Sequence, residues 1–374
     1  MQLCIDENIV LGKEAFSLFG KVKLLNGREI TRYKIKDCEI LIVRSVTKVN
    51  SSLLENTKIR FVGTTTIGID HINTEYLKQN KIFFAYAPGC NSYSVAEYVF
   101  SALIFLSAKY SFRLNEKTLG IIGVGNIGSK VKRFAEALGM KVIANDPPRS
   151  DKGEIGFSSL EETLSADIIT FHVPLIKQGK YKTYHLLNKE NLTFLPKESI
   201  IINTSRGSVI DNIALFDFVK NNGNPLVLDV WENEPNPYHE LVRLADISTP
   251  HIAGYSYDGK LNGTKMVFEK LNKFLRTNYK WQFGDEQNLS IIDCRPFKDK
   301  EEILRKIFNS VYRVDKDSET FKKKFLSSKK ATSVFDMFRK NYPKRLELSH
   351  FKAIINTETD ASFLRDFRVD YEIR

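Results

Sequence analysis

Short apolar runs rich in β-branched residues alternate along this chain with stretches whose apolar positions recur at helical spacing. Such alternation is typical of an α/β fold, in which helices cover parallel sheets. Near the N-terminus, four runs predict the strands of a small flavodoxin-like domain: residues 2–5, 40–43, 61–64 and 82–85. We expect this substrate or lid domain to span residues 1–92 and to include a returning helical stretch at 255–283.

A second group of runs predicts a doubly wound parallel sheet, the Rossmann arrangement, in residues 93–254. The expected strands are residues 118–122, 141–145, 199–204 and 226–231. Between the first two strands, apolar residues recur at helical spacing from Ile127 to Leu138, which predicts a helix. Another helix should begin near Ser92 and lead the chain from the first domain into this one.

The chain after residue 283 has a different character. A polar break at residues 284–288 predicts a linker, and a small α+β domain should occupy the rest, so that the two together span 284–374. Between residues 321 and 345 there are nine basic residues against one acid, Asp336. Aromatic residues alternate with these charges at roughly helical spacing: Phe321, Phe325, Phe335, Phe338 and Tyr342. This pattern predicts an amphipathic helix with a lysine-rich face toward solvent, in a domain with exposed aromatic side chains.

The glycine-rich run at 123–128 (GVGNIG) joins an expected strand to an expected helix. In such a turn the first glycine permits the bend, the second lets the backbone approach a pyrophosphate, and the third allows close packing. Asp146 follows the next strand, where an acid accepts hydrogen bonds from ribose hydroxyls and repels a 2′-phosphate. The pattern favours NAD, although nearby Arg149 leaves NADP open. The alternative is a glycine turn that only connects strand and helix.

Three motifs later in the chain place an arginine, a glutamate and a histidine after expected strands. Arg206 follows the strand at 199–204, and its planar guanidinium suits binding of a substrate carboxylate. Glu234 and His251 follow the next two strand ends. Because a nearby carboxylate stabilises an imidazolium, this pair suits acid–base chemistry near neutral pH. The alternatives are a surface arginine in a loop and a structural histidine.

Together these motifs make the chain resemble the D-isomer-specific 2-hydroxyacid dehydrogenases. The resemblance rests on four stretches: residues 123–128 with Asp146, 204–207, 229–235 and 249–254. Other stretches resemble the branch of this family that acts on 4-phospho-D-erythronate: residues 41–50, 63–71, 87–99, 311–315 and 335–347. The similarity thus extends over essentially the whole chain.

The resemblance implies roles for individual residues. The catalytic residues would be Arg206, Glu234 and His251, with His251 as the proton donor and acceptor. The residues that contact the nucleotide would be Gly123, Gly125, Asn126, Ile127, Gly128, Asp146, Val173, Thr204, Asp229 and Gly254. The residues that contact the substrate would be Ser45, Thr66 and Tyr255. Val173 stands where the family usually has threonine, so only its backbone remains to hydrogen-bond the cofactor.

The implied activity is the NAD-dependent oxidation of 4-phospho-D-erythronate to 2-oxo-3-hydroxy-4-phosphobutanoate, by hydride transfer from C2, in pyridoxal 5′-phosphate biosynthesis. The C-terminal domain at 284–374 would join two copies of the chain in a homodimer. Arg44 and Lys48 are the nearest basic candidates for binding the 4-phosphate. Two alternatives stay open: another D-2-hydroxyacid dehydrogenase, such as one for phosphoglycerate or glycerate, and a non-enzymatic dinucleotide-sensing protein.

Composition is that of a soluble globular protein with two or three domains: 374 residues, 42% hydrophobic and 27% charged. The four cysteines are widely spaced and the six histidines lack metal-ligand spacing, so we expect neither a disulfide framework nor a metal site. The net charge of +11 suggests nucleic-acid binding, but no recognised motif accompanies it, and we expect no such partner.

Nothing in the sequence predicts a membrane segment. The best apolar run, residues 99–108, is half of the ~20 residues needed to span a bilayer and predicts a buried helix. Asp6 and Glu7 lie where a signal peptide would have an apolar stretch. We therefore expect a cytoplasmic protein.

Overall fold

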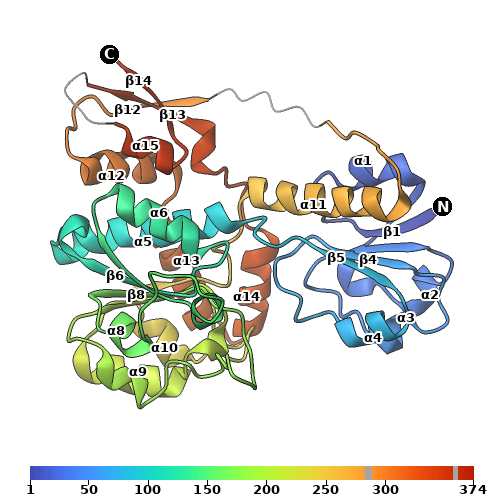
Figure 1. Cartoon of the computed structure of the whole chain (residues 1–374), viewed down its shortest axis with the longest axis horizontal. Helices are drawn as coiled ribbons and strands as arrows, with labels where there is room; N and C mark the ends of the chain where they lie inside the picture. Colours follow the sequence, from blue (N-terminus) through green and yellow to red (C-terminus); the bar gives the residue numbers. More distant parts are fainter. Residues whose placement is uncertain (283–288, 357–360) are drawn as a thin grey trace. The chain divides into compact units, whose positions relative to one another are not determined.

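The computed structural model describes residues 1–282, 289–356 and 361–374, so the linker expected at 284–288 lies outside the described residues. The chain divides into two compact units (Figure 1). The first unit comprises Met1–Asn91 and Tyr255–Gln287, and the second comprises Ser92–Gly254 and Asn288–Arg374. The C-terminal residues thus cluster with the second unit, and their role as a separate dimerisation domain stays a prediction.

The first unit is built on a five-stranded parallel sheet with strand order β2-β1-β3-β4-β5, which is the flavodoxin-like order. Its strands are β1 Gln2–Asp6, β2 Lys21–Leu25, β3 Ile40–Val43, β4 Phe61–Thr64 and β5 Phe83–Tyr86. The sequence predicts four of these strands and misses β2. Lys21 and Lys23 make β2 a polar, exposed edge strand, so its residues lack the apolar pattern of a buried one.

Helices cover this first sheet. The short ones are α1 Gly12–Phe16, α2 Arg32–Ile35, α3 Ser51–Leu54 and α4 Thr74–Gln79. The longer α11 Tyr257–Leu275 packs on β4 and β5, and its Val267, Phe268 and Leu271 are buried with Phe61. Gly63 of β4 lets this helix come close, since a Cβ there would lie 2.6 Å from Cγ1 of Val267.

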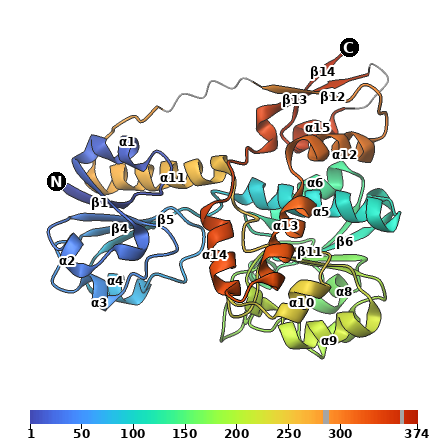
Figure 2. The same cartoon turned by 180° about the vertical axis from the view of Figure 1, so that it is seen from behind.

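The second unit is built on a six-stranded parallel sheet with order β11-β10-β9-β8-β6-β7, which confirms the predicted Rossmann fold. Its strands are β6 Thr118–Ile122, β7 Lys141–Asn145, β8 Ile168–Phe171, β9 Ile200–Asn203, β10 Leu226–Leu228 and β11 Ile247–Ser248. Helices lie on both faces (Figures 1 and 2): α5 Ser92–Tyr110, α6 Gly128–Ala137, α7 Pro147–Ser150, α8 Leu160–Leu164, α9 Asn212–Asn222 and α10 His239–Leu244. Because β6 pairs with both β7 and β8, the strand order reverses there, and ligands of such sheets bind beside that point.

Residues 289–356 and 361–374, called the C-terminal segment from here on, add a second sheet to this unit. Its parallel strands, in the order β12-β13-β14, are β12 Ser290–Asp293, β13 Phe351–Ile355 and β14 Asp370–Ile373. Its helices are α12 Lys300–Val311, α13 Val314–Ser327, α14 Ala331–Lys340 and α15 Phe363–Asp366. The predicted amphipathic stretch is therefore two helices, α13 and α14. Phe321, Phe325 and Phe335 are fully buried in the core of the unit, so the expectation of exposed aromatic side chains is wrong for these three.

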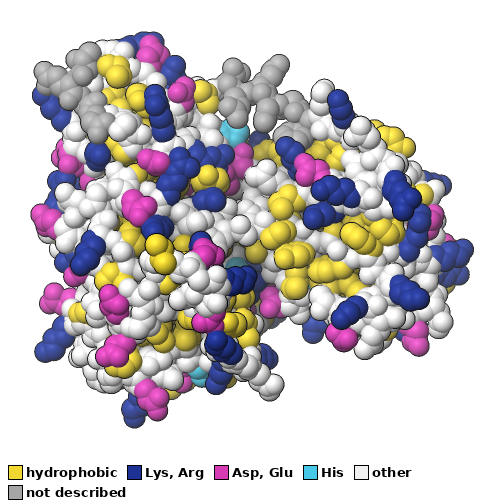
Figure 3. Space-filling model, in the orientation of Figure 1, with side chains coloured by type: hydrophobic (Ala, Val, Ile, Leu, Met, Phe, Trp, Pro, Cys, Tyr) yellow, Lys and Arg dark blue, Asp and Glu magenta, His cyan; other side chains and the backbone are white. Residues whose placement is uncertain are grey.

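The surface shows no concentration of positive charge on the face in Figure 3, where lysine and arginine side chains are spread over both units. Hydrophobic side chains gather on the first unit around β5, whose Phe83 and Tyr86 are exposed. Among the helices of the described residues, none is long and apolar enough to cross a membrane.

A cluster of charged side chains is buried where the C-terminal segment meets α5. Glu97 of α5 accepts a hydrogen bond from the Leu348 backbone N–H at 2.9 Å, and Arg368 donates to Glu347 at 2.7 Å. Burial, and next the charge of Glu347, raise the pKa of Glu97 to about 8, although Arg345 and Arg368 oppose the shift. Glu97 is therefore mostly protonated at neutral pH in the folded protein.

We predict that Glu97 makes the free energy of unfolding fall as the pH rises from about 5 to 8. In this range the unfolded chain has lost the Glu97 proton, whose ordinary pKa is 4.5, while the folded protein still binds it. Because the folded state binds more protons, its stability declines with rising pH. Urea unfolding at several pH values should show this slope, and Glu97→Gln should reduce it. Glu116→Gln, at an exposed position, is the control, and an equal slope in both variants would contradict the prediction.

Candidate active site

The strands of the second sheet end in register, which brings the residues that follow them to one edge. Ile122 of β6 pairs with Asn145 and Phe171, and the pairing continues through Asn203 and Leu228 to Ser248. The residues that come directly after these strand ends are Gly123, Asp146, His172, Thr204, Asp229 and Thr249. The candidate cofactor and catalytic residues of this unit therefore share the carboxyl edge of one sheet.

The glycine turn between β6 and α6 has the geometry of a dinucleotide cradle. Gly123 has a φ of +90°, which L side chains rarely adopt, and its N–H donates to the Asn145 carbonyl at 2.8 Å. A Cβ at Gly128 would lie 2.0 Å from the Gly123 carbonyl oxygen, so the third glycine is needed for α6 to begin there. A Cβ at Gly125 would meet nothing within 4 Å. The backbone of Gly125, with Asn126 and Ile127 after it, is thus open to a diphosphate at the start of α6.

Asp146 is already engaged with this turn. Its Oδ2 accepts a hydrogen bond from the Val124 N–H at 2.8 Å, and its Oδ1 accepts one from the Arg149 N–H at 3.3 Å. Arg149 in turn donates from Nη1 to the Val124 carbonyl at 2.8 Å and from Nε to Glu154 at 2.8 Å. Since Glu154 neutralises Arg149, the charge that would favour a 2′-phosphate is compensated, which supports NAD over NADP.

On the other side of the turn, Val173 packs against Gly123, where a Cβ would lie 2.7 Å from Cγ1 of Val173. His172 is buried between Thr170, 3.0 Å from its Nε2, and Thr204, 3.4 Å from its Nδ1. Burial lowers the pKa of His172 to about 3, so its imidazole is neutral. No role was predicted for His172, because a lone histidine is not distinctive.

The structure brings Glu234 and His251 together, as the sequence predicts. Oε2 of Glu234 lies 2.8 Å from Nδ1 of His251, and its Oε1 accepts a hydrogen bond from the Trp231 N–H at 3.0 Å. Burial by itself raises the pKa of Glu234, but the charge and hydrogen bond of His251 outweigh burial, and the pKa is lowered. Glu234 therefore stays a carboxylate. With Nδ1–H donating to it, the Nε2 atom of His251 remains for proton exchange with a ligand.

Asp229 holds the turn that carries His251. Its Oδ1 accepts hydrogen bonds from the Ile252 N–H and the Thr249 hydroxyl, both at 2.7 Å, and its Oδ2 accepts one from the Ala253 N–H at 2.9 Å. The His251 N–H donates to the Asp229 carbonyl at 2.6 Å. Asp229 is 1% exposed, and burial raises its pKa against the opposing effect of these donors. The structure thus gives Asp229 a positioning role that the sequence did not suggest, and its contact with a nucleotide stays a prediction.

Arg206 follows β9 in a turn that Asn203 organises. The Asn203 side chain accepts from the Ser205 N–H at 3.0 Å and donates to the Arg206 carbonyl at 3.0 Å, while Arg206 donates from Nη1 to the Ser205 carbonyl at 2.8 Å. A Cβ at Gly207 would lie 1.9 Å from the Trp231 carbonyl, so the loops after β9 and β10 are in direct contact. Arg206, Glu234 and His251 therefore follow three neighbouring strands, β9, β10 and β11.

The predicted substrate residues belong to the first unit. Ser45 is exposed after β3, next to Arg44, whose Nε donates to buried Asp6 at 3.0 Å. Thr66 follows β4 and donates from its hydroxyl to the Gly68 carbonyl at 2.8 Å. Tyr255 is the first residue of the unit after Gly254, and the Lys260 ammonium lies 4.8 Å from its ring centroid. Their contact with a substrate stays a prediction.

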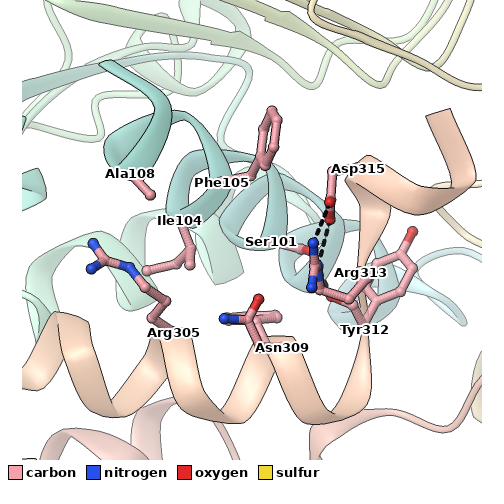
Figure 4. A pocket seen from close by; sticks show the side chains of 10 residues that line it. Ser101, Ile104, Phe105, Ala108, Arg305, Asn309, Tyr312, Arg313 and Asp315 are labelled. Atoms are coloured by element: carbon pink, nitrogen blue, oxygen red, sulfur yellow. Dashed lines mark hydrogen bonds and ion pairs between the residues drawn. The ribbon is translucent and has the colours of Figure 1, made fainter. Parts of the chain in front are cut away.

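Other candidate sites are poorly supported. Within the described ranges, no three His, Cys, Asp or Glu side chains are placed to hold a metal ion. The four cysteines are buried and free. A hollow between α5 and α12 is lined by Ser101, Phe105, Arg305 and Tyr312 among others, and none of the catalytic candidates reaches it (Figure 4).

Comparison with known proteins agrees with this geometry. Residues 104–253 match the NAD-binding domain of the D-isomer-specific 2-hydroxyacid dehydrogenases, and residues 285–367 match a domain of unknown function. The chain is 42% identical over 370 residues to a protein of Proteus mirabilis named erythronate-4-phosphate dehydrogenase, covering 97% of both chains. A protein of the same name from Escherichia fergusonii is 43% identical over 378 residues, with the same coverage.

Solved structures of related enzymes share the fold. One is D-lactate dehydrogenase of Aquifex aeolicus with NAD and lactic acid, which is 27% identical with a TM-score of 0.61 and covers 74% of this chain and 96% of its own. Another is NAD-bound 3-phosphoglycerate dehydrogenase of Entamoeba histolytica, which is 26% identical with a TM-score of 0.63 and covers 76% of this chain and 99% of its own. The chain therefore belongs to the D-isomer-specific 2-hydroxyacid dehydrogenases, NAD-dependent oxidoreductases, and within them to the erythronate-4-phosphate dehydrogenase family.

Proposed function

We propose that this protein oxidises 4-phospho-D-erythronate with NAD to 2-oxo-3-hydroxy-4-phosphobutanoate, as a step in pyridoxal 5′-phosphate biosynthesis. The observation that carries the chemistry is the Glu234–His251 pair, 2.8 Å apart at the carboxyl edge of the cofactor sheet. The name shared by relatives that match 97% of the chain supports the substrate.

In this reaction His251 removes the proton of the C2 hydroxyl. Its Nε2 accepts that proton while Nδ1–H stays bound to Glu234, whose negative charge stabilises the imidazolium that forms. NAD, which the turn at 123–128 and Asp146 would hold, would supply the acceptor for the hydride that leaves C2, while the electron pair of the broken O–H bond forms the second bond of the C2 carbonyl. Arg206 binds the C1 carboxylate through its planar guanidinium and so orients C2 for the transfer.

The first unit would supply the remaining contacts. Ser45, Thr66 and Tyr255 would bind the substrate, and Arg44 and Lys48 are the basic candidates for its 4-phosphate. Arg44 keeps part of its guanidinium available because the bond to Asp6 uses Nε. We place the protein in the cytoplasm, as a homodimer formed through the C-terminal segment, whose exposed Ile291 and Ile373 offer apolar contact area.

The substrate proposal predicts that 4-phospho-D-erythronate gives the highest kcat/KM among 2-hydroxy acids. NADH formation should be followed at 340 nm with 4-phospho-D-erythronate, unphosphorylated D-erythronate, 3-phospho-D-glycerate and D-glycerate. Loss of the phosphate contact should lower kcat/KM by roughly two orders of magnitude or more, as expected when a charged partner is left unpaired. A higher kcat/KM with 3-phospho-D-glycerate or D-glycerate than with 4-phospho-D-erythronate would contradict the proposed substrate. NADH binding without turnover of any acid would favour a sensing protein.

For the acid–base pair, we predict that His251→Ala lowers kcat by roughly 10²- to 10⁴-fold while NADH binding persists. Glu234→Gln should also lower kcat, since the amide cannot stabilise the imidazolium by charge. Glu240→Gln is the matched control, because Glu240 lies on α10 and pairs with exposed Arg243. Wild-type kcat in His251→Ala would exclude the proposed role of His251.

Cofactor choice gives a further prediction for Asp146. Asp146→Asn keeps one of the two oxygens that accept from the Val124 and Arg149 N–H groups, and it removes the charge that repels a 2′-phosphate. The preference for NAD over NADP should therefore narrow about tenfold or more, since removal of a charge repulsion near the surface is worth about 1–4 kcal/mol. Dissociation constants of NADH and NADPH measure the preference. Asp151→Asn, at the other end of α7 from Asp146, should leave the preference for NAD unchanged.

A further inference from the structure

The C-terminal segment contacts the stretch of chain that leads to His251 at several points. On α13, Lys322 donates from Nζ to the Ala245 carbonyl at 2.6 Å and to the Arg243 carbonyl at 3.0 Å. These carbonyls lie at the end of α10, just before β11. The Ser318 hydroxyl accepts a hydrogen bond from the Ser248 N–H at 2.9 Å. β11 is the edge strand of the cofactor sheet, so no further strand is present to accept a bond from the Ser248 N–H. Ser318 of α13 accepts that bond instead.

Arg345 extends these contacts to the turn at 249–253 that carries His251, called the catalytic turn from here on. It is 6% exposed, and its Nη2 donates to the carbonyls of Ala253 and Ser94, each at 3.1 Å, and also to the Ser94 hydroxyl. Ser94 in turn donates from Oγ to the Ala253 carbonyl at 2.8 Å. Ala253 is two residues after His251, and Ser94 lies in the first turn of α5. Arg345 thus joins the end of the catalytic turn to α5.

The guanidinium of Arg345 is fixed from its other side. Its Cζ lies 4.0 Å from the ring centroid of Tyr312, at the end of α12. The Tyr312 carbonyl accepts a hydrogen bond from the Ser101 hydroxyl of α5 at 2.8 Å, and the two residues lie next to each other in Figure 4. Among the described residues, Nε and Nη1 of Arg345 have no hydrogen-bond partner, so its hydrogen bonding rests on Nη2.

We propose that the C-terminal segment is part of the catalytic apparatus of its own chain, and that Arg345 is a positioning residue for His251. Asp229 holds the turn at 249–253 from the sheet side through the N–H groups of Ile252 and Ala253. Arg345 holds the end of the same turn through the Ala253 carbonyl, which belongs to the next peptide group. The turn is thereby fixed by a donor and an acceptor, and His251, with its strained φ of +58°, is held facing Glu234.

This proposal rests on the proposed function of His251 as acid and base, and it predicts a selective effect on kcat. Arg345→Met keeps most of the buried stem but removes the donors, so kcat should fall by roughly 10- to 100-fold, the cost of displacing a catalytic group by up to about 1 Å. NADH binding should change little. The urea midpoint should fall, because Arg345 is buried beside Glu97 and Glu347, so kcat is measured under conditions in which the variant is folded. Arg345→Lys should recover most of kcat, since one ammonium can replace the bonds that Nη2 makes. Arg313→Gln is the control, because Arg313 pairs with Asp315 away from the turn (Figure 4).

A second readout separates this proposal from the proposed function. The ring NMR resonances of His251, assigned with His251→Ala, should move in Arg345→Met and stay in place in Arg345→Lys and Arg313→Gln, whether or not a substrate is known. Unchanged kcat and unchanged His251 resonances in Arg345→Met would overturn the positioning role. So would a loss of NADH binding in proportion to kcat. If Arg345→Met does not fold, Ser318→Ala should lower kcat and move the same resonances, and a wild-type result there would overturn the proposal.

Discussion

The arrangement of this site depends on one buried carboxylate, that of Asp229. A buried charge is costly unless its hydrogen-bonding capacity is met, and here two N–H groups and one hydroxyl meet it. All three donors come from residues 249–253, on either side of His251. These three bonds offset the cost of burying the carboxylate, and they also fix the conformation of the turn at 249–253. Asp229 follows β10, which lies between β9 and β11 in the sheet. The loop that continues from Asp229 carries Glu234, which meets His251.

The edge position of β11 explains why a C-terminal segment can matter to catalysis. β11 has two paired residues, Ile247 and Ser248, and one flank of the sheet ends there. Such a short edge strand gives little stability by itself. α13 covers it, buries Phe321 and Phe325 in the core of the unit, and leaves Lys323 and Lys324 exposed. The basic aromatic pattern, which predicted an amphipathic helix, belongs in its first part to a helix that covers the edge of a sheet.

Buried strands and glycine geometry could be predicted from the sequence because both leave local patterns. The fully buried β3, β4 and β9 are of this kind, as are Gly123 and Gly128, whose neighbours exclude a side chain. The equally buried β8 was not predicted. β2 was missed because an exposed edge strand needs no apolar alternation. Asp229 and Arg345 were assigned no positioning role because their partners are distant in sequence: 92 positions separate Arg345 from Ala253. Residue type and spacing identify candidate chemistry, while the bonds that hold it in place depend on the fold.

The same distinction applies to the cofactor cradle. The glycine turn after β6 has Asp146, which follows β7, on one flank, bonded to the Val124 N–H, and Val173, after β8, on the other, packed against Gly123. Both flanks contact the turn and restrict its conformation. A threonine at 173 would have added a hydroxyl, whereas valine has the same shape and fills the same space beside Gly123. Valine therefore keeps the packing that shapes the turn, and only the backbone of residue 173 is left for the predicted hydrogen bond to the cofactor.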